Sequence, residues 1–95
     1  MVERNFRTSQ GEIDIIVEKE HDLHYIEVKT YRAFDVASME QVIGPRKRGR
    51  LFRVGLEFLE YHPNYLHYSI QFDLIYIDKS TNELFWFEDI LQHEN

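Results

Sequence analysis

GEIDII at residues 11–16 and YIEVK at residues 25–29 are the two runs on which the predicted fold depends. Each run is apolar enough for a β-strand, and the polar residues 19–22 between them predict a hairpin turn. This hairpin pairs residues whose numbers sum to 41, so Asp14 is expected to face Glu27. Directly opposed Cβ atoms lie roughly 4.5–5.5 Å apart, where like charges repel. The two facing carboxylates therefore predict a bound cation.

The same register sorts the other side chains of the hairpin by face. Glu12 and Lys29 fall on the charged face, beside the two carboxylates. The opposite face is apolar, and its expected pairs are Ile13 with Val28 and Ile15 with Ile26. A shift of one residue would mix the two faces, because side chains alternate along a strand.

Composition and length set the class of protein. The chain has 95 residues, 43% of them hydrophobic and 29% charged, which predicts one folded domain over residues 1–95. It contains no cysteine, which excludes disulfides and thiolate metal sites. We find no apolar run long enough to span a bilayer and no signal-peptide pattern at Met1, so no membrane partner and a cytoplasmic location are expected.

The charge is unevenly distributed. The formal net charge of −6 argues against a simple electrostatic binder of nucleic acid. Residues 41–56, however, contain no acidic residue. The basic residues of this segment that we expect to contact nucleic acid are Arg46, Lys47, Arg48 and Arg50. A solvated helix face is the alternative interpretation of this cluster.

Strand patterns occupy residues 2–8, 68–78 and 83–88 in addition to the hairpin, and residues 38–43 favour a short helical turn. Both faces of the last two strands are apolar, so the sheet is expected to be covered on both sides. One long helix covers only one side. Two explanations for the missing cover are open: a longer form of the chain, or a partner subunit, for which a homodimer that covers the exposed sheet face is the candidate.

The long helix is predicted to start at Pro45, since proline suits the first helical position, and to end at residues 62–64. Its apolar stripe consists of Leu51, Val54, Phe58 and Leu59. Lys47 lies on the same stripe, one turn earlier, so we expect its side chain to reach toward the sheet.

The charged face of the hairpin has the chemistry of a magnesium or manganese site. Mg²⁺ takes oxygen ligands, commonly one or two carboxylates with phosphate oxygens and waters. Asp14, Glu27 and the backbone carbonyl of Val28 are the predicted ligands, with Glu12 beside them. Such a site can promote the attack of water on a phosphodiester. Lys29 would stabilise the negative charge that develops in that attack. The alternative is a surface hairpin with a Glu12–Lys29 ion pair of little energetic value.

Other polar residues have simpler explanations. An aspartate at a strand position such as that of Asp73 more often has a structural role than a role in a functional site. The histidines, at positions 21, 24, 62, 67 and 93, show no convincing metal-ligand spacing.

Several stretches together resemble the PD-(D/E)XK nuclease superfamily, and more closely its bacterial YraN-type, Holliday-junction-resolvase-like branch. They are GEID and IEVK in the hairpin, ERNFR at residues 3–7, GPRKR at residues 44–48, FDLI at residues 72–75 and, more weakly, FEDI at residues 87–90. Ile13 stands where the superfamily name has proline. The resemblance covers nearly the whole chain.

This resemblance implies an α/β, restriction-endonuclease-like mixed β-sheet flanked by helices, with the usual N-terminal helix absent. It also implies that Asp14 and Glu27 bind Mg²⁺ or Mn²⁺ and that Lys29 is the catalytic lysine. The implied function is an endonuclease that cleaves DNA, including branched or non-duplex DNA. A non-catalytic nucleic-acid-binding module of the same fold and a protein-interaction domain are the alternatives.

Overall fold

The computed structural model describes residues 1–31 and 45–90. Its strands form one mixed sheet in the order β1-β2-β3-β4-β5, in which only β3 and β4 pair in parallel. The elements are β1 (Glu3–Thr8), β2 (Gly11–Lys19), β3 (Asp22–Tyr31), α2 (Pro45–Tyr61), the 3₁₀ turn η1 (Pro63–Tyr65), β4 (Ser69–Asp78) and β5 (Glu83–Phe87). The architecture is the predicted restriction-endonuclease-like α/β fold.

The predicted strands and the long helix are confirmed, with ends that shift by a residue at most for the strands. The predicted turn at residues 38–43 lies outside the described residues. No helix within the described ranges is both long and apolar enough to cross a membrane.

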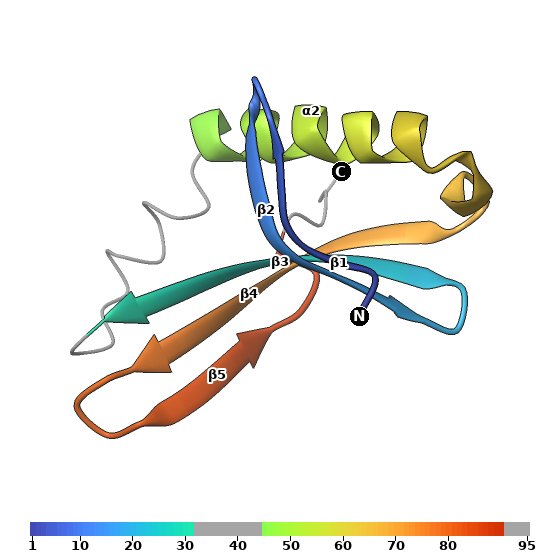
Figure 1. The fold of residues 1–95 in the computed structure, drawn as a ribbon. Helices are drawn as coiled ribbons and strands as arrows, with labels where there is room; N and C mark the ends of the chain where they lie inside the picture. Colours follow the sequence, from blue (N-terminus) through green and yellow to red (C-terminus); the bar gives the residue numbers. More distant parts are fainter. Residues whose placement is uncertain (32–44, 91–95) are drawn as a thin grey trace.

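Helix α2 packs on one face of the sheet, and the β1–β2 hairpin rises beside it (Figure 1). The helix buries Leu51, Val54 and Phe58 as predicted, while Leu59 is partly buried. The sheet contributes Phe6, Ile13, Ile16, Leu23, Tyr25 and Phe72 to the same core. This packing fixes the position of α2 on the sheet.

At Gly55, α2 passes very close to the side chain of Tyr25 in β3. A Cβ atom at this position would lie 2.6 Å from Cε2 of Tyr25, which is too close for any real contact. The Tyr25 hydroxyl also donates a 2.9 Å hydrogen bond to the Gly55 carbonyl. Burial raises the pKa of Tyr25 well above its ordinary value, so this hydroxyl stays a donor. Glycine therefore allows the helix to pack directly on the tyrosine ring.

We expect Gly55→Ala to lower the free energy of unfolding by about 1–3 kcal/mol, because the added methyl overpacks the core. Gly49→Ala is the matched control in the same helix, since the added Cβ would meet only Nη1 of Arg53, at an ordinary contact distance of 3.6 Å. That change should raise the free energy of unfolding by roughly 0.5–1 kcal/mol through helix propensity. Urea unfolding followed by circular dichroism measures both. Equal stabilisation by the two changes would contradict the packing described.

The β1–β2 hairpin bends at Asn5 and Asp14. The strand residues before and after Asn5 pair with β2 in one register, but Asn5 and Asp14, which this register would place opposite each other, are not paired. Asn5 also has a φ of 54°. Across the bend the side chains change phase, so Ile13 and Ile16 both enter the helix-side core. The prediction that Ile13 shares one face with Ile15 and Ile26 was therefore wrong, because uninterrupted alternation does not hold through a bend.

The bend also ends the β2–β3 ladder. The predicted register is confirmed from Lys19 with Asp22 to Ile15 with Ile26, and no further pairs follow. The predicted facing pairs beyond that point were wrong: Asp14 with Glu27, Ile13 with Val28 and Glu12 with Lys29. Figure 1 shows the strands separating here as β2 turns toward α2. Residues of β2, β3 and α2 around this separation line the pocket described below.

The sheet face away from α2 is covered unevenly. Ile26 and Asp73 are adjacent on this face and buried, whereas Trp86 and Leu84 are 50% and 59% exposed. Within the described residues, α2 packs on the other face. The predicted dimer across this face stays a prediction.

Candidate functional site

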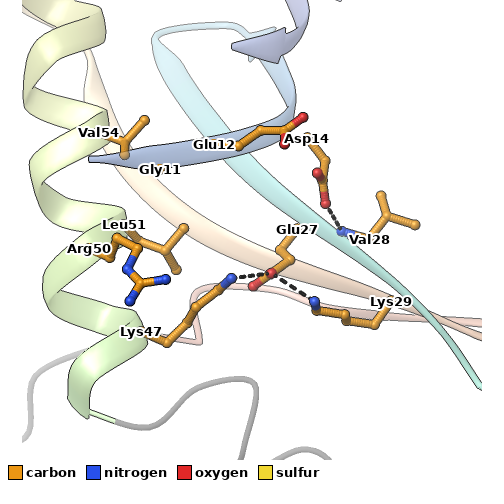
Figure 2. Close-up of a pocket in the computed structure, with 10 residues that line it drawn as sticks. All are labelled: Gly11, Glu12, Asp14, Glu27, Val28, Lys29, Lys47, Arg50, Leu51 and Val54. Atoms are coloured by element: carbon orange, nitrogen blue, oxygen red, sulfur yellow. Dashed lines mark hydrogen bonds and ion pairs between the residues drawn. The ribbon is translucent and has the colours of Figure 1, made fainter. Parts of the chain in front are cut away.

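A pocket of about 250 Å³ opens where β2 leaves β3 beneath the first turns of α2 (Figure 2). Its lining consists of Gly11, Glu12, Asp14, Glu27, Val28, Lys29, Lys47, Arg50, Leu51 and Val54. The strands supply the acidic side chains and Lys29, while the helix supplies Lys47 and Arg50. Leu51 and Val54 of α2 line the pocket as well and belong to the hydrophobic core. A charged pocket thus lies directly on the edge of the hydrophobic core.

Most of the residues that we predicted for the site line this pocket. Glu12, Asp14, Glu27, Val28 and Lys29 come together there although Asp14 and Glu27 are not ladder partners. Of the predicted nucleic-acid contacts, Lys47 and Arg50 line the pocket and Arg48 does not. The side chain of Arg46 lies outside the described part of the chain.

Glu27 is the central acidic group of the pocket. It is 92% buried, and its Oε1 atom lies 2.8 Å from Nζ of Lys47 and 3.3 Å from Nζ of Lys29. Figure 2 shows the two ammonium groups approaching this carboxylate from the helix and from β3. A buried carboxylate needs such compensation, because removal of its charge from water is costly. The predicted reach of Lys47 toward the sheet is confirmed.

The second oxygen of Glu27 is in a different situation. Oε2 is buried and makes no hydrogen bond, so far as the described residues show. Buried polar atoms in native proteins are almost always satisfied by protein, water or an ion. An acceptor of this kind at the wall of a polar pocket is available to a water molecule or to a ligand with positive charge or donor groups.

Asp14 reaches the pocket from the bend in β2. Its Oδ2 atom accepts a 2.8 Å hydrogen bond from the backbone N–H of Val28 and so replaces the missing ladder contact. The N–H and C=O of one residue in a strand point to the same neighbour. The carbonyl of Val28 is therefore also directed to the side of Asp14. This is the direction that the predicted ligand role of that carbonyl requires.

The remaining charged side chains are partly occupied elsewhere. Nε of Arg7 lies 3.3 Å from Oε2 of Glu12, so the Glu12–Lys29 ion pair of the alternative interpretation is not formed. Lys29 and Lys47 are both about one-third exposed, at 35% and 30% of their side-chain surface. Both lysine side chains thus line the pocket and retain part of their solvent exposure.

Asp73 does not line the pocket and lies on the opposite face of the sheet. It is fully buried, and its two oxygens lie 2.9–3.0 Å from four partner atoms. These are Nδ1 of His24, Nε2 of Gln71, Nε1 of Trp86 and the backbone N of Asp89. The structural interpretation of Asp73 is confirmed: it links β3, β4 and the end of β5.

Sequence reasoning missed a group of potential metal ligands around this aspartate. Single ligand atoms of His24, Asp73 and Glu88 lie within 4.8 Å of one another. Because their positions are far apart in the chain, no spacing rule links them. Both oxygens of Asp73 are already hydrogen-bonded, so the group is explained as a structural network without an ion.

The family model named "Uncharacterised protein family UPF0102" matches residues 1–77. The chain belongs to UPF0102. This family is the YraN-like group of PD-(D/E)XK type, which confirms the resemblance seen in the sequence. The matched range contains the pocket-lining residues from Gly11 to Val54 and ends within β4.

Curated relatives carry the same UPF0102 name. A protein from Syntrophomonas wolfei is 36% identical over 77 residues, which cover 81% of this chain and 66% of the relative. One from Treponema pallidum is 35% identical over 75 residues, 79% of this chain and 60% of the relative. One from Coxiella burnetii is 30% identical over 93 residues, 98% of this chain and 77% of the relative. The chain thus spans about three-fifths to two-thirds of the length of the first two UPF0102 proteins.

Proposed function

We propose that this pocket is the active site of a divalent-metal-dependent endonuclease that cleaves DNA phosphodiester bonds. The supporting observation is Glu27: a buried carboxylate with one oxygen between two lysines and the other without a donor among the described residues. Asp14 enters the same pocket from the neighbouring strand. An acid pair with a lysine two residues after the second acid is also the motif of the PD-(D/E)XK group.

The donor set fits a hard divalent cation. Asp14 and Glu27 supply carboxylate oxygens and Val28 supplies a carbonyl oxygen, which are the ligand types that Mg²⁺ and Mn²⁺ accept. These residues would hold the ion, and the unpartnered oxygen of Glu27 is the acceptor that it would satisfy. When bound, the cation supplies positive charge against phosphate oxygens and promotes deprotonation of the attacking water.

The lysines have separate positions with respect to the substrate. Lys29 follows Glu27 on the same face of β3, so its ammonium group is suited to orient the attacking water or stabilise the developing oxyanion. Lys47 approaches from α2 and is suited to contact a non-bridging phosphate oxygen as a point charge. The charge of Glu27 holds both ammonium groups at the pocket before a substrate phosphate would enter it.

The charge balance of the pocket agrees with an anionic substrate. Its lining has three acids and three bases, so its formal charge is zero without a metal ion. Addition of one divalent cation makes the pocket strongly positive, which favours entry of a phosphodiester. Without the cation there is no net attraction. We therefore expect substrate binding in this pocket to depend on the metal.

A cleavage assay tests the proposal. We expect the purified chain to cleave at least one of duplex, single-stranded and four-way DNA in Mg²⁺ or Mn²⁺, and not in EDTA. Lys29→Met should lower the single-turnover rate by roughly 10²–10³-fold, because the loss of one preorganised charge-stabilising group has effects of this size. If the wild type leaves all three DNA forms intact in both metals, the nuclease proposal is wrong. DNA binding without cleavage would then favour the non-catalytic module.

A further inference from the structure

A second, open cleft adjoins the candidate active site. It has a volume of about 550 Å³ and lies between the β1–β2 turn and the solvent-facing side of α2. Gly11, Glu12 and Arg50 line both this cleft and the pocket, so the two are continuous. Its remaining lining is formed by Arg7, Arg53 and residues 8–10 of the turn.

The cleft is positively charged in a chain with net charge −6. Three arginines line it against one acid, Glu12, which is already paired with Arg7. Arg50 and Arg53 are exposed and have no acidic partner among the described residues. A surface with an excess of one sign of charge concentrates oppositely charged ligands. The cleft is therefore suited to an anion that approaches the pocket from this side.

The turn holds the arginines in place. Gly11 has a φ of 148°, and a Cβ atom there would lie 3.1 Å from both Cγ and Cδ of Arg50. The absence of a side chain thus lets the stem of Arg50 cross the strand at the boundary between pocket and cleft. Nε of Arg53 donates a 3.1 Å hydrogen bond to Oε1 of Gln10. The terminal nitrogens of Arg53 remain available for the bidentate contacts that arginine makes with phosphate.

We propose that this cleft binds the nucleic-acid backbone phosphate adjacent to the scissile one. Arg50 would lie at the boundary between pocket and cleft, and Arg53 further along the bound polynucleotide. The inference rests on the proposed function and extends it to the substrate. A second phosphate subsite continuous with the pocket fits a polynucleotide strand that runs past the active site over the β1–β2 turn. A nucleotide with a single phosphate would leave this subsite empty.

The salt dependence of DNA binding tests this assignment without catalysis. Binding of a fluorescent single-stranded oligonucleotide is measured by anisotropy in Ca²⁺ over a series of NaCl concentrations. Loss of one phosphate contact should reduce the slope of log K against log salt by about 0.7 for a single strand. We expect this reduction for Arg53→Gln. Lys79→Gln is the matched control. Lys79 is exposed in the β4–β5 turn, and its substitution removes the same single positive charge as Arg53→Gln.

Gly11→Ala provides a second variant that keeps every charge of the cleft. Its methyl group would displace the stem of Arg50, so binding should weaken while the formal charge is unchanged. Thermal unfolding of each variant verifies that the fold is retained. If Arg53→Gln keeps the wild-type slope, the inference is overturned, whereas cleavage by the wild type would still support the proposed function. If the slope falls but the wild type cleaves no DNA, the nuclease proposal and the adjacent-phosphate assignment both fail.

Discussion

Glu27→Gln is expected to lower the rate of metal-dependent DNA cleavage by at least roughly 10²–10³-fold while the protein stays folded. Glutamine has nearly the shape of glutamate but no charge, so it compensates neither the two lysines nor a divalent cation. Single-turnover cleavage in Mn²⁺ measures the rate, and far-UV circular dichroism verifies the fold.

Glu60→Gln is the control for this change. Glu60 is an exposed residue of α2 outside the pocket, so its loss removes one negative charge without a change in the site. Its cleavage rate should equal that of the wild type. A Glu27→Gln protein that cleaves as fast as Glu60→Gln would show that the acid is not part of the active site.

Asp73→Ala is expected to have the largest effect on stability, a loss of about 3–5 kcal/mol in the free energy of unfolding. The carboxylate is fully buried and interacts with four partner atoms. Its removal would leave these four atoms without this hydrogen-bond partner. A buried donor without a partner costs about 1–3 kcal/mol. Urea unfolding followed by circular dichroism measures the loss. For a chain of ordinary stability, such a loss is a large fraction of the total.

Two further variants define the origin of that effect. Asp73→Asn keeps one acceptor oxygen, so its loss of stability should be smaller than that of Asp73→Ala. Glu88→Gln alters an exposed member of the same cluster and should change the free energy of unfolding by no more than about 0.5 kcal/mol. An Asp73→Ala protein as stable as Glu88→Gln would contradict the role of Asp73 as a buried link between strands.

Much of the fold could be predicted because local patterns and tertiary packing agree. Alternating apolar residues defined the strands, and Pro45 with the stripe from Leu51 to Phe58 defined the helix. The register of the β2–β3 hairpin was also predictable, since a polar turn and two apolar strands leave one consistent pairing. The reach of Lys47 followed from its position on the buried stripe.

The geometry of the site was not predictable to the same degree. The bend at Asn5 and Asp14 changes the phase of both strands, and no glycine or proline at these positions signals it. Uninterrupted alternation therefore placed Ile13 on the wrong face. The site nevertheless assembles, because the strands separate where Asp14 bonds the backbone of Val28 instead of extending the ladder.

The network around Asp73 was hidden for a different reason. Its partners come from β3, from the two strands after α2 and from the backbone of Asp89, so only tertiary structure brings them together. One local signal was present: Gln71 and Asp73 share a face of β4 and hydrogen-bond at 3.0 Å. Two polar residues at alternate positions of an otherwise apolar strand indicate a buried polar network when no charge partner is near in sequence.

Calorimetric titration of the wild type, Glu27→Gln, Glu60→Gln and Glu88→Gln with Mn²⁺ tests most directly whether the pocket holds a metal ion. Binding to the wild type, to Glu60→Gln and to Glu88→Gln, together with its loss in Glu27→Gln, is the predicted result. It would assign the ion to the pocket rather than to the cluster of His24, Asp73 and Glu88. Binding of Mn²⁺ to Glu27→Gln with wild-type affinity would contradict the metal site on which the proposed nuclease depends.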